Sequence, residues 1–296
     1  MTQLDHAVAE ADMRAVSLNR QTFEPRALKS GILTCITWGI TILASVPLFS
    51  VIFMLIVEGG ARVDWEAITA LPPSAFEEGG GFGNAIVGTL VMVGIASAIS
   101  IPFGVMAAIY LAILGPTSQI ASTTRFLAKT LTGFPSILAG VFTYAGLVIA
   151  FGYSALAGGI ALSVLMLPTV VLAAEEAMRQ VPQRMKDAAY GLGCTRTQVI
   201  FKVVLPTGLP GIITGVLLAV AGAAGESAPL LFTALFSNYY IEELMEPTAS
   251  LSILIYNFSA MPFENQIQLA WAASLVLVVI VLMLNVLARL FGQPKV

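Results

Sequence analysis

Glu226 is the one Asp, Glu, Lys or Arg side chain between residues 208 and 236, a stretch that is otherwise largely apolar. An ionised carboxylate in hydrocarbon costs several kcal/mol unless it is paired or faces water. Gly225 and Ser227 leave the adjacent backbone open to close approach, and Pro229 deprives the Gly225 carbonyl of its helical hydrogen bond. We therefore expect Glu226 to point into a helix bundle or toward a partner subunit.

Two kinds of chemistry are open to this carboxylate. It can pair with an arginine of a neighbouring subunit as an assembly contact, or it can line a polar path together with Gly225 and Ser227. Ser136, beside Pro135, is a further candidate for such a path, because its hydroxyl can donate a hydrogen bond to an oxyanion. A serine in this setting more often makes a packing contact between helices, so both roles stay open for Ser136.

A second group of candidate residues lies in residues 175–207, which form a long charged stretch between apolar segments. Proline is favoured in the first turn of a helix, and glycine ends helices readily. Pro182 at one end and Gly191 with Gly193 at the other therefore predict a short helix over residues 183–190.

A second short helix follows in the same stretch. Thr195 and Gln198 have the spacing of a capping box, so this helix is expected to begin at Thr195 and to end before Pro206. The resulting hairpin carries two small residues, Ala188 and Ala189, which permit close approach by another protein. The hairpin is therefore either a docking surface or an internal packing feature of a large loop.

The composition of the chain predicts that these residues are positioned by transmembrane helices. The 296 residues are 57% hydrophobic and 10% charged, with a mean hydropathy of +0.90, whereas soluble domains carry about 25% charged residues. Continuous apolar runs require helices in lipid, since the strands of membrane barrels alternate apolar and polar residues. The sequence predicts an all-α, polytopic membrane protein with six transmembrane helices, at residues Gly31–Val57, Ala85–Leu114, Leu131–Ala150, Ala155–Ala174, Gly208–Phe236 and Ile267–Phe291.

The basic residues divide unequally between the loops of this arrangement. If both termini are cytoplasmic, 13 of the 14 Lys and Arg residues fall on the cytoplasmic side, with Arg289 at the cytoplasmic end of the sixth span, and Arg62 alone falls outside. Cytoplasmic loops retain Lys and Arg, so the pattern predicts cytoplasmic N- and C-termini. We expect residues 1–30 to form a cytoplasmic N-terminal segment and residues 31–296 a six-helix transmembrane domain, with 175–207 as its large cytoplasmic loop.

Four prolines fall inside the predicted spans. Each one removes a backbone donor and frees the carbonyl four residues earlier, so a kink is the ordinary consequence. Freed carbonyls that line a polar path are the alternative. The four residues are Pro47, Pro102, Pro135 and Pro168.

Composition also excludes several classes of function. A net charge of −3 gives no general surface for nucleic acid, and two cysteines, Cys35 and Cys194, suggest neither a disulfide framework nor a metal site. The sequence has no phosphate-cradling G-x-x-x-x-G-K-[ST] loop. Because no Cys–His, His-cluster or paired-acid constellation occurs in the spans, a membrane enzyme is not predicted.

The loop 175–207 resembles the EAA loop of ABC-importer permeases. That pattern reads Glu-Ala-Ala, three residues, Gly, nine residues, Ile, one residue, Leu-Pro. The matching residues, with Asp for Glu and Val for Ile, are Asp187, Ala188, Ala189, Gly193, Val203, Leu205 and Pro206. The resemblance implies the type I permease (MetI-like) fold and a non-catalytic chain without its own cofactor. It also implies that the loop docks into a separate ATPase subunit, which binds ATP and Mg²⁺.

A narrower resemblance runs from about residue 85 to the C-terminus. The segments 225–233, 133–137 and 255–258 are similar to those of the A-type permeases of Pst high-affinity phosphate importers. This resemblance implies an inner-membrane complex of bacteria with a homologous permease of the PstC type, two ATPase subunits of the PstB type and an external phosphate-binding protein of the PstS type. In such a complex Glu226 could accept a hydrogen bond from hydrogen phosphate and repel fully ionised sulfate.

One departure from that family keeps alternatives open. Family members often carry an arginine three or four residues before the Gly-Glu pair, whereas Gly222 and its neighbours here are uncharged. Either another subunit supplies this charge, or the importer takes another oxyanion or small solute. A stand-alone secondary transporter would need intramembrane charges of its own and typically an inverted repeat, and the sequence offers one glutamate and no visible repeat.

Overall fold

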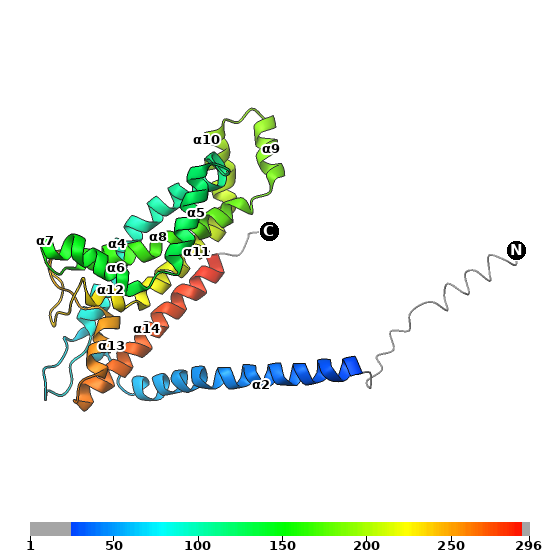
Figure 1. Ribbon diagram of the computed structural model, residues 1–296. Coiled ribbons are helices and arrows are strands. Elements are labelled where there is room, and N and C mark those ends of the chain that lie inside the picture. Colours follow the sequence, from blue (N-terminus) through cyan, green and yellow to red (C-terminus); the bar gives the residue numbers. More distant parts are fainter. Residues whose placement is uncertain (1–24, 292–296) are drawn as a thin grey trace, which may run out of the picture. The chain divides into compact units, whose positions relative to one another are not determined.

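The computed structural model describes residues 25–291, with side chains from residue 28 onward, and within that range every regular element is a helix (Figure 1). Most of the expected N-terminal segment 1–30 lies outside the described residues, as do Arg14, Arg20 and Lys295. The chain divides between Phe53 and Met54 into two compact units. We describe each unit by itself.

The described part of the first unit is helix α2 (Pro25–Met54), apart from its last residue. Four of its hydroxyl side chains donate to the carbonyl four residues earlier, each at 2.8 Å; they belong to Thr34, Thr37, Thr41 and Ser45. Polar groups in lipid must be satisfied internally, so these bonds suit a helix that crosses a membrane. Pro47 lies inside α2, as expected for a proline within the first span.

The second unit is a bundle of helices and short π-helical turns. Its elements are η1 (Leu55–Gly59), α3 (Trp65–Thr69), α4 (Gly83–Ile109), η2 (Tyr110–Leu114), α5 (Gln119–Thr132), α6 (Ser136–Thr143), η3 (Tyr144–Val148), α7 (Ile149–Phe151), α8 (Ala155–Arg179), α9 (Gln183–Gly191), α10 (Arg196–Val199), η4 (Ile200–Val204), α11 (Leu205–Gly225), α12 (Ala228–Leu231), α13 (Leu251–Ser259) and α14 (Glu264–Phe291). Helices α4 and α11 both pack against α8, and α14 packs against α11 and α13.

Five helices in the described residues are long and apolar enough to cross a membrane; they are Leu28–Gly59, Gly83–Leu114, Ala155–Arg179, Arg196–Gly225 and Glu264–Phe291. A sixth span exists only if the bent pair formed by residues 119–132 and 136–151 is counted as one. The predicted all-α, multi-pass class is confirmed.

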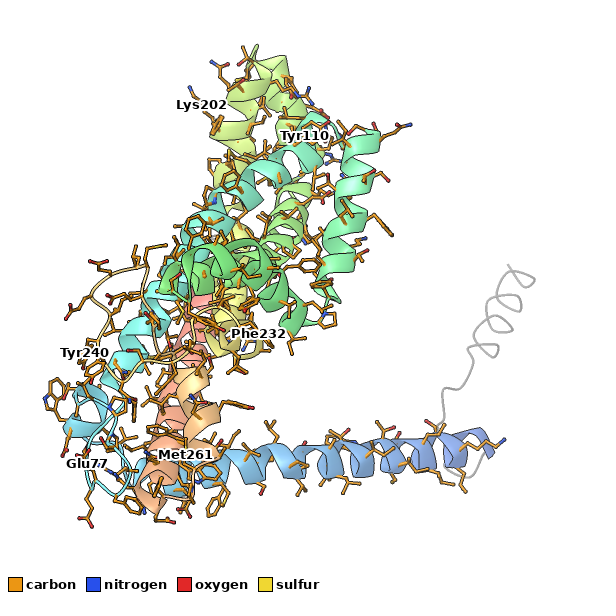
Figure 2. The ribbon with its side chains drawn as sticks, turned by 60° about the vertical axis from the view of Figure 1, so that its left-hand side comes forward. Glu77, Tyr110, Lys202, Phe232, Tyr240 and Met261 are labelled. Carbon is orange, nitrogen blue, oxygen red and sulfur yellow. The ribbon has the colours of Figure 1, made fainter. Side chains whose placement is uncertain are left out.

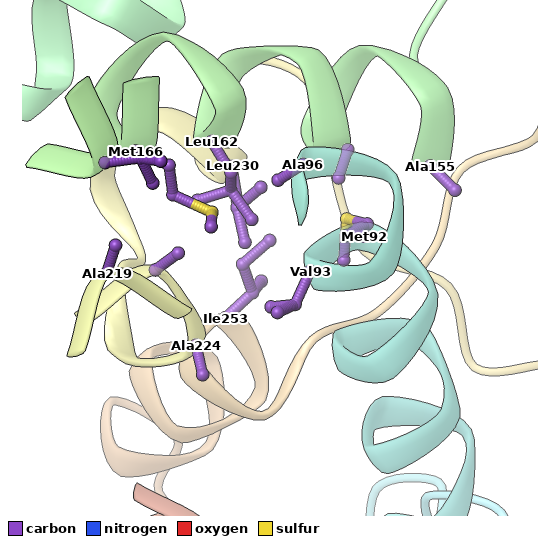
Figure 3. Packing of buried hydrophobic residues seen from close by; sticks show 13 residues of the cluster. Met92, Val93, Ala96, Ala155, Leu162, Met166, Ala219, Ala224, Leu230 and Ile253 are labelled. Carbon is purple, nitrogen blue, oxygen red and sulfur yellow. The ribbon is translucent and has the colours of Figure 1, made fainter. Parts of the chain in front are cut away.

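Small residues let α11 approach α8 closely. A Cβ atom added to Gly211 would lie 2.9 Å from the Cβ of Ala177, and one added to Gly215 would overlap with Ala173. Helices in membranes associate through such small residues, because lipid provides no hydrophobic force between them. Elsewhere in this unit, apolar side chains of α4, α8, α11, α12 and α13 form the largest core cluster, including Met92, Leu162, Met166, Leu230 and Ile253 (Figure 3).

The expected third span, residues 131–150, is wrong in its boundaries. The helix begins only at Ser136, with Pro135 at its N-cap, and the preceding helix α5 meets it at an angle of 105°. Proline disfavours a helical conformation in the residue before it, so the chain turns at Gly133-Phe134-Pro135. Pro135 therefore starts a helix and does not kink one, and α5 occupies much of the expected second loop.

The expected fifth span, residues 208–236, is displaced toward the N-terminus. A continuous helix runs from Arg196 through η4 and α11 and ends at Gly225. The second hairpin helix therefore does not end before Pro206. In η4 the amide of Leu205 bonds to the carbonyl of Ile200, five residues earlier, and this π-helical register carries the helix up to the proline.

The loops expected on one side of the membrane share one end of the second unit. Figure 2 shows Tyr110 and Lys202 at one end and Glu77, Tyr240 and Met261 toward the other. Phe232, which follows the end of α11 by a few residues, lies between the two groups. This arrangement agrees with the expected alternation of loops between the two sides.

Candidate functional site

The helix ends directly at the candidate carboxylate. Glu226 has an extended backbone, with ψ of 128°, between α11 and the short helix α12. Pro229 lies in the first turn of α12 and has no N–H to give to the Gly225 carbonyl, so α11 cannot continue through it. The expectation of one span that continues through Glu226 is therefore wrong, since the helix is interrupted at Glu226 itself.

Hydroxyl groups of α13 fix the backbone at this interruption. The Ser252 hydroxyl donates to the Glu226 carbonyl at 2.9 Å, and Ser252 lies 3.0 Å from the hydroxyl of Ser250. Ser250 is the N-cap of α13, and the Leu251 amide donates to the Thr89 hydroxyl of α4 at 2.9 Å. The turn at Glu226 is thus bonded to α13, and the start of α13 is in turn bonded to α4.

The Glu226 carboxylate has no such partner within the part of the chain that the structure describes. It makes no hydrogen bond and no ion pair there, and its residue is half-buried. Gly222 and Gly225 are exposed, and a Cβ atom at either would meet nothing within 4 Å. The carboxylate therefore borders an open, glycine-lined face of α11, where a partner subunit or a solute could reach it.

Ser136 belongs to an element next to this turn. It is the first residue of α6, which packs against α12 (Figure 1). The contact is close at Gly140, where an added Cβ would lie 2.7 Å from the Cα of Pro229. Residues four apart share one face of a helix, so Ser136 lies on the Gly140 face, one turn nearer the break before α6. The helix break before α6 and the one at Glu226 thus adjoin two helices, α6 and α12, that pack against each other. Ser136 and Ser227, one at each break, are half-buried.

The predicted hairpin is present, with α9 over residues 183–191 and α10 starting after a capping box formed by Thr195 and Gln198. Between the helices Gly193 has φ of +82°, a left-handed conformation that favours glycine. The Cys194 amide donates to the Ala189 carbonyl at 3.1 Å and closes the turn.

The two faces of α9 differ sharply. Ala189 is 7% exposed and packs in a core cluster with Met178 and Val199. Asp187 and Ala188 are exposed, and Asp187 accepts a hydrogen bond from Gln183 at 2.9 Å. The outer face also carries apolar side chains one helical turn to either side of Ala188, namely Met185 and Leu192, which is 86% exposed.

The packing alternative therefore applies to Ala189, and docking through the outer face stays a prediction. Ala189 makes internal packing contacts, whereas Ala188 belongs to an outer surface that is free in this chain. Leu205 is half-buried and Pro206 is exposed where the hairpin passes into α11.

Sequence reasoning missed a buried ion pair near the hairpin. Arg125 on α5 donates from Nε to Glu175 Oε1 at 2.6 Å, and the two side chains are 19% and 5% exposed. Arg179 lies 3.5 Å from the same carboxylate oxygen. Glu175 directly follows the apolar run of α8, and Arg125 lies in a segment that the sequence predicts to be a loop. Their spacing in the sequence therefore does not indicate that Arg125 and Glu175 pair.

The described residues contain no group of three or more His, Cys, Asp and Glu side chains that could hold a metal ion. Cys35 is exposed and Cys194 is half-buried, and neither forms a disulfide.

Comparison with known proteins gives a consistent match. Residues 100–294 match the family model described as "Binding-protein-dependent transport system inner membrane component". The phosphate transport system permease protein PstA of Pasteurella multocida is 36% identical over 274 residues, covering 92% of this chain and 98% of that protein. The probable phosphate transport system permease protein PstA of Methanocaldococcus jannaschii is 40% identical over 267 residues, covering 89% and 94%.

Solved structures give the fold. A chain of a bacterial alginate ABC transporter, in complex with an alginate-bound periplasmic protein, superposes with a TM-score of 0.59 at 15% identity, covering 93% of this chain and 100% of that one. A chain of the methionine ABC transporter MetNI in an inward-facing conformation gives a TM-score of 0.55 at 17% identity, covering 72% and 95%. The predicted type I permease fold is confirmed.

Proposed function

Since the chain belongs to the family of binding-protein-dependent transport system inner membrane components, we propose that it is the A-type permease subunit of an ATP-driven importer of inorganic phosphate. One observation carries this proposal. The chain is 36% to 40% identical to phosphate transport permeases over nearly their whole length. The matched stretches cover 92% and 89% of this chain and are too long to leave out the hairpin or the turn at Glu226.

The open face of α11 is the proposed wall of the translocation path. Two such faces, one from this chain and one from a homologous permease, would enclose a cavity. The Glu226 carboxylate, with Gly225, Ser227 and Ser136, would contact the anion there. A carboxylate can accept a hydrogen bond from the protonated oxygen of hydrogen phosphate, which sulfate lacks. The arginine absent near Gly222 would come from the partner permease.

The outer face of α9 is the proposed contact with the ATPase. Asp187 and Ala188 lie on the exposed side of a short helix, and Met185 and Leu192 extend the surface with apolar contact area. A docked subunit would cover these side chains. ATP and Mg²⁺ would be bound by two ATPase subunits, so this chain would need no cofactor and would catalyse no reaction itself.

The same proposal sets the topology. The hairpin and Lys202 would face the cytoplasm with both termini, and the opposite end would meet an external phosphate-binding protein. Residues 31–296 would act as one transmembrane domain and 1–30 as a cytoplasmic segment. Closure of the ATPase dimer would move the hairpin, and the cavity between the permeases would open outward.

Substrate-stimulated ATPase activity tests this function. The complete complex is reconstituted in nanodiscs with its external binding protein, and ATP hydrolysis is measured with phosphate, sulfate, molybdate and an amino acid in turn. We expect phosphate alone to stimulate hydrolysis. Stimulation by sulfate or molybdate instead of phosphate would assign the importer to another oxyanion, as the missing arginine allows.

A further inference from the structure

The inference concerns the cytoplasmic end of the second predicted span, formed by η2 and the residues after it. The last four carbonyls of a helix have no partner within the helix. Here the helix ends at Leu114, so the carbonyls of residues 111–114 need donors from elsewhere. Two arginines supply donors to three of them, the carbonyls of Leu111, Ile113 and Leu114.

The first arginine is Arg125 of α5. Its Nη2 atom donates to the Leu111 carbonyl at 2.7 Å, and its Nη1 atom donates to the Pro116 carbonyl at 2.9 Å. Its Nε atom donates a hydrogen bond to the Glu175 carboxylate, near the end of α8 and just before the hairpin begins. A single guanidinium therefore joins the entry of the hairpin to the end of the second span.

The second arginine is Arg196, the first residue of α10, directly after the turn between the two hairpin helices. Its Nη2 atom donates to the Leu114 carbonyl at 2.7 Å and to the Ile113 carbonyl. A positive charge at a helix C-terminus is also favoured by the helix dipole. The entry of the hairpin and the start of its second helix are thus both tied to the six residues Leu111–Pro116, which we call the anchor segment.

We infer that Arg125 and Arg196 are positioning residues that couple the hairpin to the second span, so that the hairpin and the anchor segment move as one body. This inference rests on the proposed function, because the movement in question is driven by an ATPase docked on α9. A planar guanidinium suits this role because its five donors can serve several carbonyls at once, whereas a lysine ammonium acts as a point charge.

The test compares Arg196→Gln with Lys202→Gln in the complete reconstituted complex. Lys202 lies one to two turns further along the same helix and makes no hydrogen bond or ion pair in the described part of the chain, so its variant controls for loss of a nearby charge. We expect Arg196→Gln to keep subunit stoichiometry and ATP hydrolysis but to lower phosphate transported per ATP hydrolysed about fivefold or more. Arg196→Lys should recover only part of this ratio, and Lys202→Gln should match the wild type.

A second readout does not depend on the substrate. Spin labels are placed at Thr117→Cys, next to the anchor segment, and at Thr197→Cys in α10, with Cys35 and Cys194 replaced by serine. We expect the same distance distribution with and without trapped ATP, and a broader one when Arg196→Gln is added. The inference would be overturned if the wild-type distance changes when ATP is trapped. It would also be overturned if Arg196→Gln leaves both the phosphate transported per ATP hydrolysed and the distance distribution unchanged. If phosphate is not the substrate, only the first readout fails, so the two failures are distinguishable.

Discussion

The Nε atom of Arg125 lies 2.6 Å from a carboxylate oxygen of Glu175, fifty residues further along the chain. This contact joins α5 to the end of α8 at a site where the glutamate side chain is only 5% exposed. Because a buried carboxylate without its partner is expensive, the pair determines where α5 can pack.

We predict that Arg125→Met destabilises the chain, because the buried Glu175 carboxylate then has, among the described residues, only the exposed Arg179, 3.5 Å away, as a charged partner. The expected cost is at most about 3–5 kcal/mol, the cost of breaking a buried ion pair. The double variant Arg125→Met/Glu175→Leu should regain much of that stability, since it removes both charges. Thermal unfolding in detergent, followed by loss of the monodisperse peak, measures the difference. A double variant no more stable than Arg125→Met would show that the carboxylate is not the source of the loss.

The close approach of α6 to α12 gives a second prediction. A Cβ at Gly140 would lie 2.7 Å from the backbone of Pro229, whereas one at Gly146, further along the same segment, meets nothing within 4 Å. Gly140→Ala should therefore push α6 away from the turn at Glu226, with a loss of about 1–3 kcal/mol and reduced phosphate uptake. Gly146→Ala is the matched control and should change neither stability nor uptake.

The two faces of α9 separate docking from folding. Ala188→Asp places a charge on the outer face, so the permease should remain folded but no longer co-purify with its ATPase. Ala189→Asp buries a charge in the core cluster and should reduce the amount of folded permease itself. Gly193→Pro is incompatible with a φ of +82° and should distort the hairpin. Retained assembly and normal uptake in both Ala188→Asp and Gly193→Pro would contradict the docking surface.

Glu226→Gln keeps the size and hydrogen-bonding capacity of the side chain and removes its charge. If the carboxylate lines the path, the complex should stay intact while phosphate uptake falls by about tenfold or more or sulfate is admitted, as loss of a charged hydrogen bond of ~1.5–3 kcal/mol implies. If the carboxylate is an assembly contact, the complex itself should dissociate.

Phosphate uptake and subunit stoichiometry are measured on the same preparation, with Glu243→Gln as the control. That residue is exposed in the long segment between α12 and α13. Wild-type values for both quantities in Glu226→Gln would mean that neither role is correct.

Much of this fold could be predicted from the sequence, because apolar runs of sufficient length have few alternatives in lipid. The hairpin could also be predicted, since Pro182, Gly193 and the Thr195 capping box each determine the local backbone conformation. The break before Ser136 was harder to predict, because Gly133-Phe134-Pro135 sits inside an apolar run and hydropathy does not register a 105° turn. The Arg125–Glu175 pair depends on tertiary packing, which neither residue's neighbours reveal.

The most direct test of the central claim is uptake of radiolabelled phosphate into proteoliposomes that contain this chain, its partner permease and the ATPase, with the binding protein outside and ATP inside. We predict accumulation that requires ATP, the binding protein and every subunit, with no uptake by liposomes that contain this chain alone. Accumulation by the chain alone, driven by an ion gradient without ATP, would contradict the account and identify a secondary transporter instead.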